Sequence, residues 1–147
     1  MAQLQPITMK QAKIEISAPL LGIFWTSIKG GKMSHEEVSY NDGAQGLELV
    51  FTGLTKLENI TLTKPYDPVN DAAIHSFISS QRSAKTAFSV SVTPVNADIA
   101  GSPISGGKTI IYNNCTFISY NPPQFDRDGT GLAKVEMVIG LNSLPTF

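Results

Sequence analysis

Two short segments contain residue types that bind phosphate or metal ions in other proteins. Residues 102–109 read SPISGGKT and end like a phosphate-binding loop, but that motif needs Gly six places before its Lys, where this chain has Ser102. The next residues favour a strand, whereas a phosphate-binding loop opens a helix. Residues 126–131, DRDGTG, lack the third acidic position and the closing Glu of a calcium loop, so a β-turn is predicted there. Neither segment predicts a ligand site.

The chain has one cysteine and two histidines, too few for a closed zinc site without added carboxylate ligands. His35 and Cys115 fall in expected strands and His75 in an expected helix. None of them is part of a motif that pairs a nucleophile with a base. The sequence therefore predicts no catalytic residue, no cofactor and no metal ion, and a protein that is not an enzyme. A single cysteine also excludes an intramolecular disulfide and fits synthesis in a reducing compartment.

The composition predicts one domain, and its low charge favours contact with other protein over much of its surface; the alternative is a small β domain whose surface is polar but neutral. The 147 residues are expected to form a single domain, residues 1–147. Charged residues make up 16% of the chain, against about 25% in ordinary soluble domains, and the cores of protein interfaces are similarly depleted of charge. The net charge of −1 argues against a face that grips nucleic acid. No apolar run is long enough to span a membrane, and no secretory signal is visible.

Alternation of apolar and polar residues predicts a mainly β fold. We expect a β-sandwich or open barrel of about seven strands, with one short α-helix packed on the sheet. The pair Gly30-Gly31 is expected to form a turn with positive φ. Asn41-Asp42-Gly43 predicts a hairpin-type turn.

The one expected helix follows the strand over residues 57–64. Pro65 ends that strand because proline cannot donate to a sheet ladder. Pro68 suits the first turn of a helix, and Asp67 is placed to cap the exposed amides of that turn. The apolar residues at helical spacing, which are expected to pack on the sheet, are Ala73, Ile74, Phe77 and Ile78.

A hairpin pattern in residues 34–43 and the segment 50–64, VFTGLTKLENITLTK, precede the expected helix. This order of elements resembles the tube proteins of contractile phage tails, and the resemblance spans about residues 20–141. After Lys64 the chain continues with Pro65, where the family often has a basic residue and Gly, so a secretion-system tube protein of similar fold stays an alternative. The matching residues are Glu37, Val38, Tyr40, Gly43, Gly53, Leu54, Lys56, Asn59, Ile60, Thr61 and Leu62.

The resemblance implies a structural protein that forms six-membered rings, stacked into a hollow tube through which DNA leaves a phage capsid without specific binding. Each subunit would contribute strands to a continuous multi-subunit β-barrel. The implied partners are further copies of the chain and the sheath, baseplate, tail terminator and tape-measure proteins. The protein would be made in the host cytoplasm and end in the virion. The alternative outside this class is a monomeric β-sandwich binding module, which would be expected to carry more surface charge.

Ring-to-ring contact is predicted in two segments, residues 42–55 and an N-terminal arm, residues 1–10. The first is expected as a loop whose returning half alternates between apolar and polar residues. The second has apolar residues without an evident internal partner. Both segments have the alternative of being mobile, as termini and loop tips often are. The predicted contact residues are Asp42, Gly43, Leu47, Leu49, Phe51, Leu4 and Ile7.

A small, uncharged face is predicted to line the lumen of the tube. Ser89, Ser91 and Thr93 alternate with apolar residues of one strand. Sixfold symmetry would repeat every lumen charge six times, and a ring of cations would retard a passing duplex. The alternative for this face is ordinary solvation.

Overall fold

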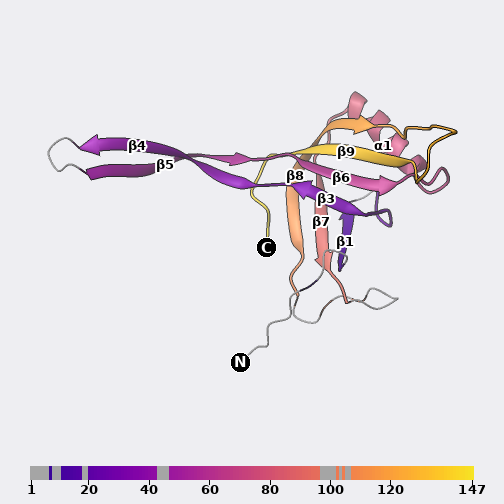
Figure 1. Cartoon of the computed structure of the whole chain (residues 1–147), viewed down its shortest axis with the longest axis horizontal. Coiled ribbons are helices and arrows are strands. Elements are labelled where there is room, and N and C mark those ends of the chain that lie inside the picture. The colour runs from indigo at the N-terminus through magenta and orange to yellow at the C-terminus, as the bar shows by residue number, and fades with distance from the viewer. Residues whose placement is uncertain are drawn as a thin grey trace.

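The computed structural model describes residues 7, 11–17, 20–42, 47–96, 102, 104 and 107–147. This part of the chain forms nine strands and one helix (Figure 1). In chain order they are β1 (Ala12–Ile16), β2 (Phe24–Trp25), β3 (Ser27–Gly30), β4 (Met33–Asp42), β5 (Leu47–Leu57), β6 (Ile60–Pro65), α1 (Ala72–Ser83), β7 (Phe88–Pro94), β8 (Ile110–Asn121) and β9 (Lys134–Leu141).

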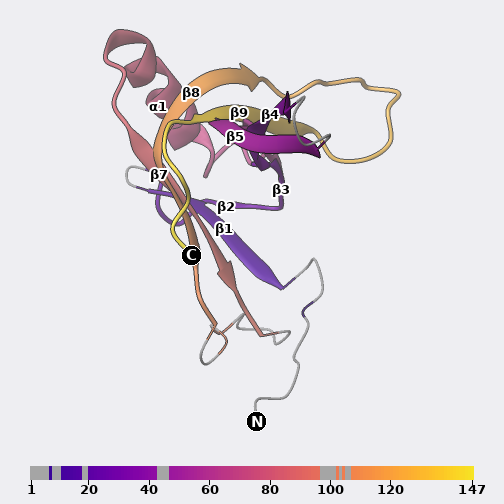
Figure 2. The same cartoon turned by 90° about the vertical axis from the view of Figure 1, so that its left-hand side faces the viewer.

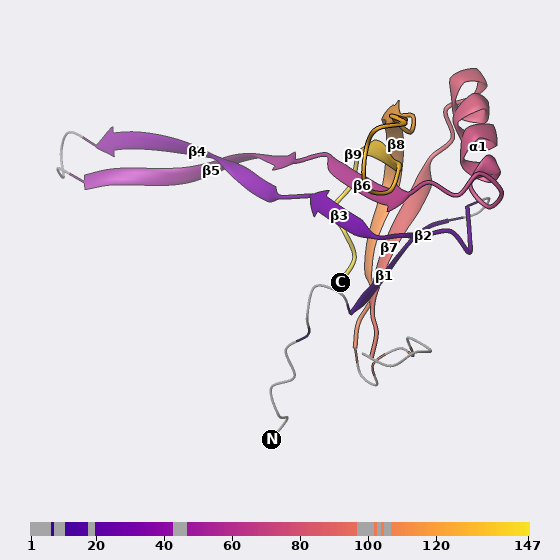
Figure 3. The same cartoon turned by 45° about the vertical axis from the view of Figure 1, so that its right-hand side comes forward.

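Seven strands form one antiparallel sheet in the order β2-β1-β7-β8-β9-β6-β3 (Figure 3). The strands at the two ends of this order, β2 and β3, are consecutive in sequence and separated only by Thr26. The backbone N–H and the Oγ1 hydroxyl of Thr26 both donate to the carbonyl oxygen of Thr63, each at 2.9 Å. One bent strand therefore pairs with β1 at its start and with β6 at its end, which nearly closes the sheet into a barrel. The predicted fold class is confirmed.

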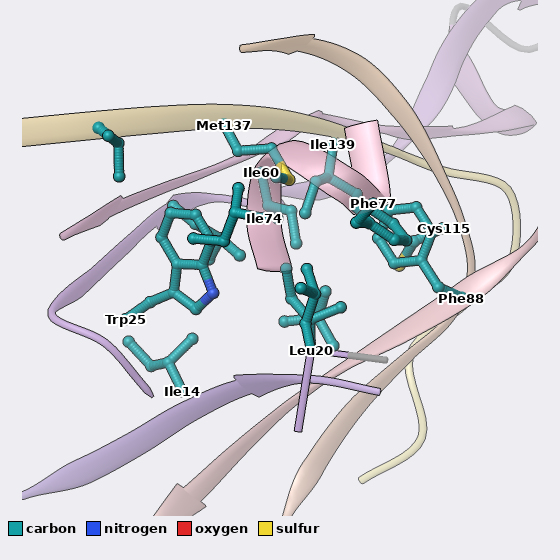
Figure 4. Packing of buried hydrophobic residues seen from close by; sticks show 14 of the residues in the cluster. Ile14, Leu20, Trp25, Ile60, Ile74, Phe77, Phe88, Cys115, Met137 and Ile139 are labelled. Carbon is teal, nitrogen blue, oxygen red and sulfur yellow. The ribbon is translucent and has the colours of Figure 1, made fainter. Parts of the chain in front are cut away.

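The interior of this barrel is apolar because each strand alternates between an inward and an outward residue. Figure 4 shows the inward side chains meeting those of α1. From α1, Phe77 is 4% exposed and sets its ring edge-on to Phe88, with 5.2 Å between ring centroids. The predicted helix stripe is confirmed for Ile74 and Phe77, which are buried, and for Ile78, which is partly buried; Ala73 is exposed. The fully buried side chains include Ile16, Leu20, Ile60, Leu62, Val90, Cys115, Val135, Met137 and Ile139.

The helix begins later than the sequence suggested. Asp67 and Pro68 belong to a turn that precedes α1, and Asp67 Oδ1 accepts hydrogen bonds from the backbone N–H groups of Val69 and Asn70 at 3.1 and 3.3 Å. The predicted cap by Asp67 is therefore a turn cap and not the helix cap. The physical reason is Asp71, the residue before the helix, whose buried carboxylate is held by Lys64 and by the backbone N–H of Asp67.

Strands β4 and β5 form a separate two-stranded antiparallel ribbon that extends away from the barrel (Figure 1). The ribbon continues the pairing of β3 with β6, since Gly30 pairs with Ile60 and Met33 with Leu57. Gly30 and Gly31 have the predicted positive φ, 88° and 80°. They bend the strand without reversing it, so the expected turn at this point is wrong.

The segment expected as a loop, residues 42–55, is largely strand. β5 begins at Leu47 and pairs with β4 from Asp42↔Leu47 to Met33↔Leu57. This antiparallel pairing confirms the predicted hairpin. Its predicted turn is displaced, because Asn41 and Asp42 belong to β4 and pair with Glu48 and Leu47. The expectation of a loop is wrong because the backbone groups of this returning half are bonded to β4, and Gly43 lies outside the described residues.

The bend at Gly30 supports a stability prediction with an internal control. A Cβ at Gly30 would lie 2.2 Å from the carbonyl oxygen of Asn59, whereas a Cβ at Gly22, with a nearly equal φ of 89°, would meet nothing within 4 Å. Gly22→Ala is expected to cost about 1–2 kcal/mol through positive φ alone. Gly30→Ala is expected to cost about 1–3 kcal/mol more than Gly22→Ala, because the backbone near Asn59 must also shift. Urea unfolding of both variants checks the difference, and equal midpoints would contradict it.

Candidate assembly surfaces

The outer face of the barrel is rich in small hydroxyl side chains. On β7, Phe88 and Val90 are buried, whereas Ser89, Ser91 and Thr93 on the opposite face are partly exposed. The Ser91 hydroxyl donates to the carbonyl oxygen of Glu15 at 3.4 Å, and the Thr93 and Thr109 hydroxyls lie 3.4 Å apart. The predicted alternation is present, and the placement of this face in a lumen stays a prediction.

The register adds two charges to this face that the sequence reasoning did not place there. Lys13 pairs with Thr93, and Glu15 pairs with Ser91 across β1 and β7. Lys13 Nζ lies 5.7 Å from the ring centroid of Phe24, and the backbone N–H of Gly22 donates to Glu15 Oε2 at 2.9 Å. The two charges have opposite sign, so they cancel each other. The alternation of Lys13 and Glu15 with the buried Ile14 and Ile16 is the sequence signal that could have found them.

Among the described strands, part of the outer edge of β1 has no neighbour and can pair with a further strand. β1, β7 and β8 run side by side (Figure 2), and β1 pairs with β7 over all five of its residues. On its other edge β1 pairs with β2 only at Ile14 and Glu15, so among the described strands the edge at Ala12 and Lys13 has no partner. On the far side of β8, Ile111 and Thr146 exchange two backbone hydrogen bonds of 2.8 Å.

The β4–β5 ribbon alternates between apolar and polar residue pairs. Val38 pairs with Phe51 and Tyr40 with Leu49. Between and beside them, Glu37 pairs with Thr52, Ser39 with Val50 and Asn41 with Glu48.

The remaining predicted contact residues lie in or near the N-terminal arm. Ile7 is 46% exposed, and Leu4 lies outside the described residues. Their contact with another ring stays a prediction.

The chemically reactive side chains are buried in the fold or form hydrogen bonds within it. Burial raises the pKa of the Cys115 thiol to about 11, so it is protonated at neutral pH. His75 Nε2 lies 3.0 Å from the Tyr120 hydroxyl on the surface of α1, and burial raises the pKa of Tyr120.

The backbone N–H of Gly129 donates to the carbonyl oxygen of Asp126 at 3.0 Å, which confirms the predicted β-turn.

Two features are absent from the described residues, a cluster of metal ligands and a membrane-spanning helix. Within this part of the chain, no three His, Cys, Asp or Glu side chains are grouped so that they could hold a metal ion. None of the helices described is long and apolar enough to cross a bilayer.

Solved structures with this arrangement come from contractile injection systems. A chain of the PVC sheath/tube terminator in the extended state matches with a TM-score of 0.78 and 21% sequence identity, over 97% of this chain and 96% of that one. A chain of the PVC sheath-tube complex, from an extracellular contractile injection system, matches with a TM-score of 0.73 and 20% identity, over 94% and 88%. The chain has the fold of contractile-tail tube and terminator proteins.

A third structure with the tube-protein fold comes from a six-fold assembly. A chain of the anti-feeding prophage baseplate, six-fold symmetrised, matches with a TM-score of 0.73 and 10% identity, over 96% of this chain and 95% of that one. No protein-family model and no curated protein sequence matches the chain. At these identities the likeness concerns the fold, and it confirms the predicted resemblance at that level.

Proposed function

We propose that this chain is the tube subunit of a contractile tail, in which six copies form a ring and the rings stack into a hollow conduit. The observation that carries the proposal is the near-complete match of the fold to chains of tube and terminator assemblies. Six copies are supported by the six-fold symmetrised baseplate structure that contains a chain of the same fold. In this role the protein is structural and not an enzyme.

The edge of β1 supports lateral assembly. Ala12 and Lys13 present backbone groups without a strand partner among the described strands, and an open edge is a template for pairing with another chain. In the ring, this edge would meet the opposite side of a neighbour's β1-β7-β8 unit, where the Thr146 segment borders β8. Repeated around six subunits, that pairing would give a continuous multi-subunit barrel.

The outer face of β7 suits a lumen. Ser89, Ser91 and Thr93 are small and uncharged, and the neighbouring Lys13 and Glu15 cancel in charge. A wall of this kind holds a passing polyanion only weakly, because tight binding of nucleic acid requires many uncompensated cations. We propose that this face lines the bore.

Two candidates remain for the particle that contains the tube. The resemblance found in the sequence favours a phage tail in the virion, through which DNA is ejected. The tube would then assemble with tape-measure, sheath, baseplate and terminator proteins. The similar structures favour an extracellular injection system, because PVC is named as one. Purified particles that contain this chain separate the two: capsid-borne DNA supports the phage tail, and particles without a capsid support the injection system.

Assembly of the purified protein is the direct test of the proposal. We expect light scattering and negative-stain microscopy to show rings or tubes as the concentration rises, slowly where no baseplate initiates them. A protein that stays monomeric at high concentration, even when seeded with baseplates, contradicts the proposal and favours the monomeric binding module.

Trimming residues 1–10 or deleting residues 44–46 is expected to leave rings that do not stack into long tubes. Tubes of normal length from both variants would show that the ring-to-ring contact lies elsewhere.

A further inference from the structure

The first part of β8 extends beyond the strand that pairs with its outer edge. β9 pairs with β8 from Asn121 back to Cys115 and no further. β8 begins at Ile110, and its other edge pairs with β7. Residues 110–114 therefore have no partner among the named strands on the side of β9. Such an edge is a template for pairing with another chain unless something covers it.

Residues 142–147 cover this edge, and we call them the edge cover. They continue from the end of β9 along β8 (Figure 2). Thr146 and Ile111 exchange two backbone hydrogen bonds of 2.8 Å. Side-chain hydrogen bonds add to these two, and they include Asn142 Nδ2 to the Asn114 carbonyl oxygen at 2.9 Å, Ser143 Oγ to the Asn113 carbonyl oxygen at 3.1 Å, and Asn113 Nδ2 to Thr146 Oγ1 at 3.1 Å.

The edge cover is held less firmly than a strand of the sheet. It exchanges backbone hydrogen bonds with β8 at one residue pair, whereas β9 pairs with β8 at six. Leu144 and Phe147 in the cover are 59% and 65% exposed, so they contribute little burial. Segments with few buried contacts and exposed backbone bonds open at a low free-energy cost. The cover can therefore leave β8 while the barrel stays folded.

The edge cover is also a poor template for a further strand. Thr146 directs its N–H and its carbonyl oxygen toward Ile111, so the adjacent Pro145 and Phe147 direct theirs away from β8. Pro145 has no N–H to donate, and proline on an outer edge hinders strand pairing. A neighbouring subunit that pairs with this side of the sheet therefore does so by replacing the cover.

We propose that residues 142–147 are a removable edge cover, which blocks β8 in the free subunit and gives way to the β1 edge of a second copy in the ring. The inference rests on the proposed function and names what regulates lateral pairing. Ala12 and Lys13 of β1 have no partner among the described strands. Each free subunit thus has one open and one covered edge, and pairing is limited by the fraction of subunits whose cover has left.

A disulfide between the cover and β8 tests whether the cover must leave. Ile111 and Thr146 form a hydrogen-bonded pair, in which Cα atoms are about 5.5 Å apart, within the range of disulfides. Ile111→Cys combined with Thr146→Cys, when oxidised, is expected to keep the wild-type circular dichroism spectrum and to form rings about tenfold more slowly or worse. Reduction of the same sample is expected to restore the rate. The native Cys115 is buried and does not compete.

Two proline substitutions distinguish release of the cover from its use as a strand. Thr146→Pro removes the N–H that bonds to Ile111, so assembly measured by light scattering is expected to begin at about a fivefold lower concentration. Phe147→Pro is the matched control, because its N–H faces away from β8, and wild-type assembly is expected. If Thr146→Pro needs a higher concentration than wild type, or Phe147→Pro weakens assembly, neighbours pair with the cover in place and the proposal is wrong.

The behaviour of the wild-type protein keeps this inference separate from the proposed function. If wild-type protein forms neither rings nor tubes, even when seeded with baseplates, the proposed function fails and the inference fails with it. If wild-type rings form and the oxidised double-cysteine variant forms them at the same rate, the tube function stands and the edge cover does not regulate pairing.

Discussion

Replacing Phe77 by alanine is expected to lower the free energy of unfolding of the unassembled subunit by about 3–5 kcal/mol. Phe77 is 4% exposed and packs edge-on against Phe88, so truncation leaves a cavity between α1 and the sheet. The loss affects the only helix among the described elements, which joins the barrel through Phe77 and Ile74. Chemical denaturation followed by circular dichroism measures the change.

His75 provides the control on the same helix. Its side chain is exposed and makes a hydrogen-bonding contact with Tyr120 on the surface. His75→Ala is expected to cost less than about 1.5 kcal/mol, the usual net value of one hydrogen bond. A Phe77→Ala variant with an unchanged melting temperature would show that the helix does not depend on this contact.

Asp71→Ala is expected to cost a comparable amount of stability, about 3–5 kcal/mol, because it leaves the buried ammonium group of Lys64 without its counter-ion. Lys64 and Asp71 are 7% and 1% exposed, and Lys64 Nζ donates to both carboxylate oxygens, with 2.6 Å to Oδ1. Asp71 also accepts a hydrogen bond from the backbone N–H of Asp67 at 2.8 Å. The variant loses both interactions while Lys64 keeps only the Pro65 carbonyl as an acceptor.

A double variant distinguishes the buried charge from the packing around it. Lys64→Met combined with Asp71→Leu is expected to recover most of the lost stability, since a hydrophobic pair avoids the cost of desolvating two ions. Asp67→Ala, which removes an exposed carboxylate that caps the same turn, is expected to cost only about 0.5–2 kcal/mol. Equal losses for Asp67→Ala and Asp71→Ala would contradict a special role for the buried pair.

Local periodicity in the sequence was enough to predict the fold class and the main core positions. Phe88 and Val90 are buried because they alternate with Ser89 and Ser91, and a strand places alternate residues on opposite faces. Ile74 and Phe77 are buried because residues three apart share a face of a helix. Such patterns depend on neighbours a few residues away, so a single sequence contains them in full.

The candidate surfaces were only partly predictable. The hydroxyl face of β7 follows from alternation alone. Lys13 and Glu15 join that face only through the register of β1 with β7, and the edge of β8 is covered only because residues 142–147 lie along it. Register and the approach of distant loops depend on which strands pair, and composition does not encode that choice.

The tertiary structure alone decided how the sheet closes and where the ribbon begins. Thr26 donates hydrogen bonds to the carbonyl oxygen of Thr63. The two halves of the bent strand, β2 and β3, therefore lie at the two ends of the sheet and bring those ends together. Gly30 pairs with Ile60 and bends the chain outward, and this makes β4–β5 an extension of β3–β6 and not a loop. Lys64 and Asp71, which look like two surface charges in the sequence, are buried because each satisfies the other. These outcomes depend on backbone bonds and charges that meet only after the chain has folded, when unpaired polar groups must find partners or remain in water.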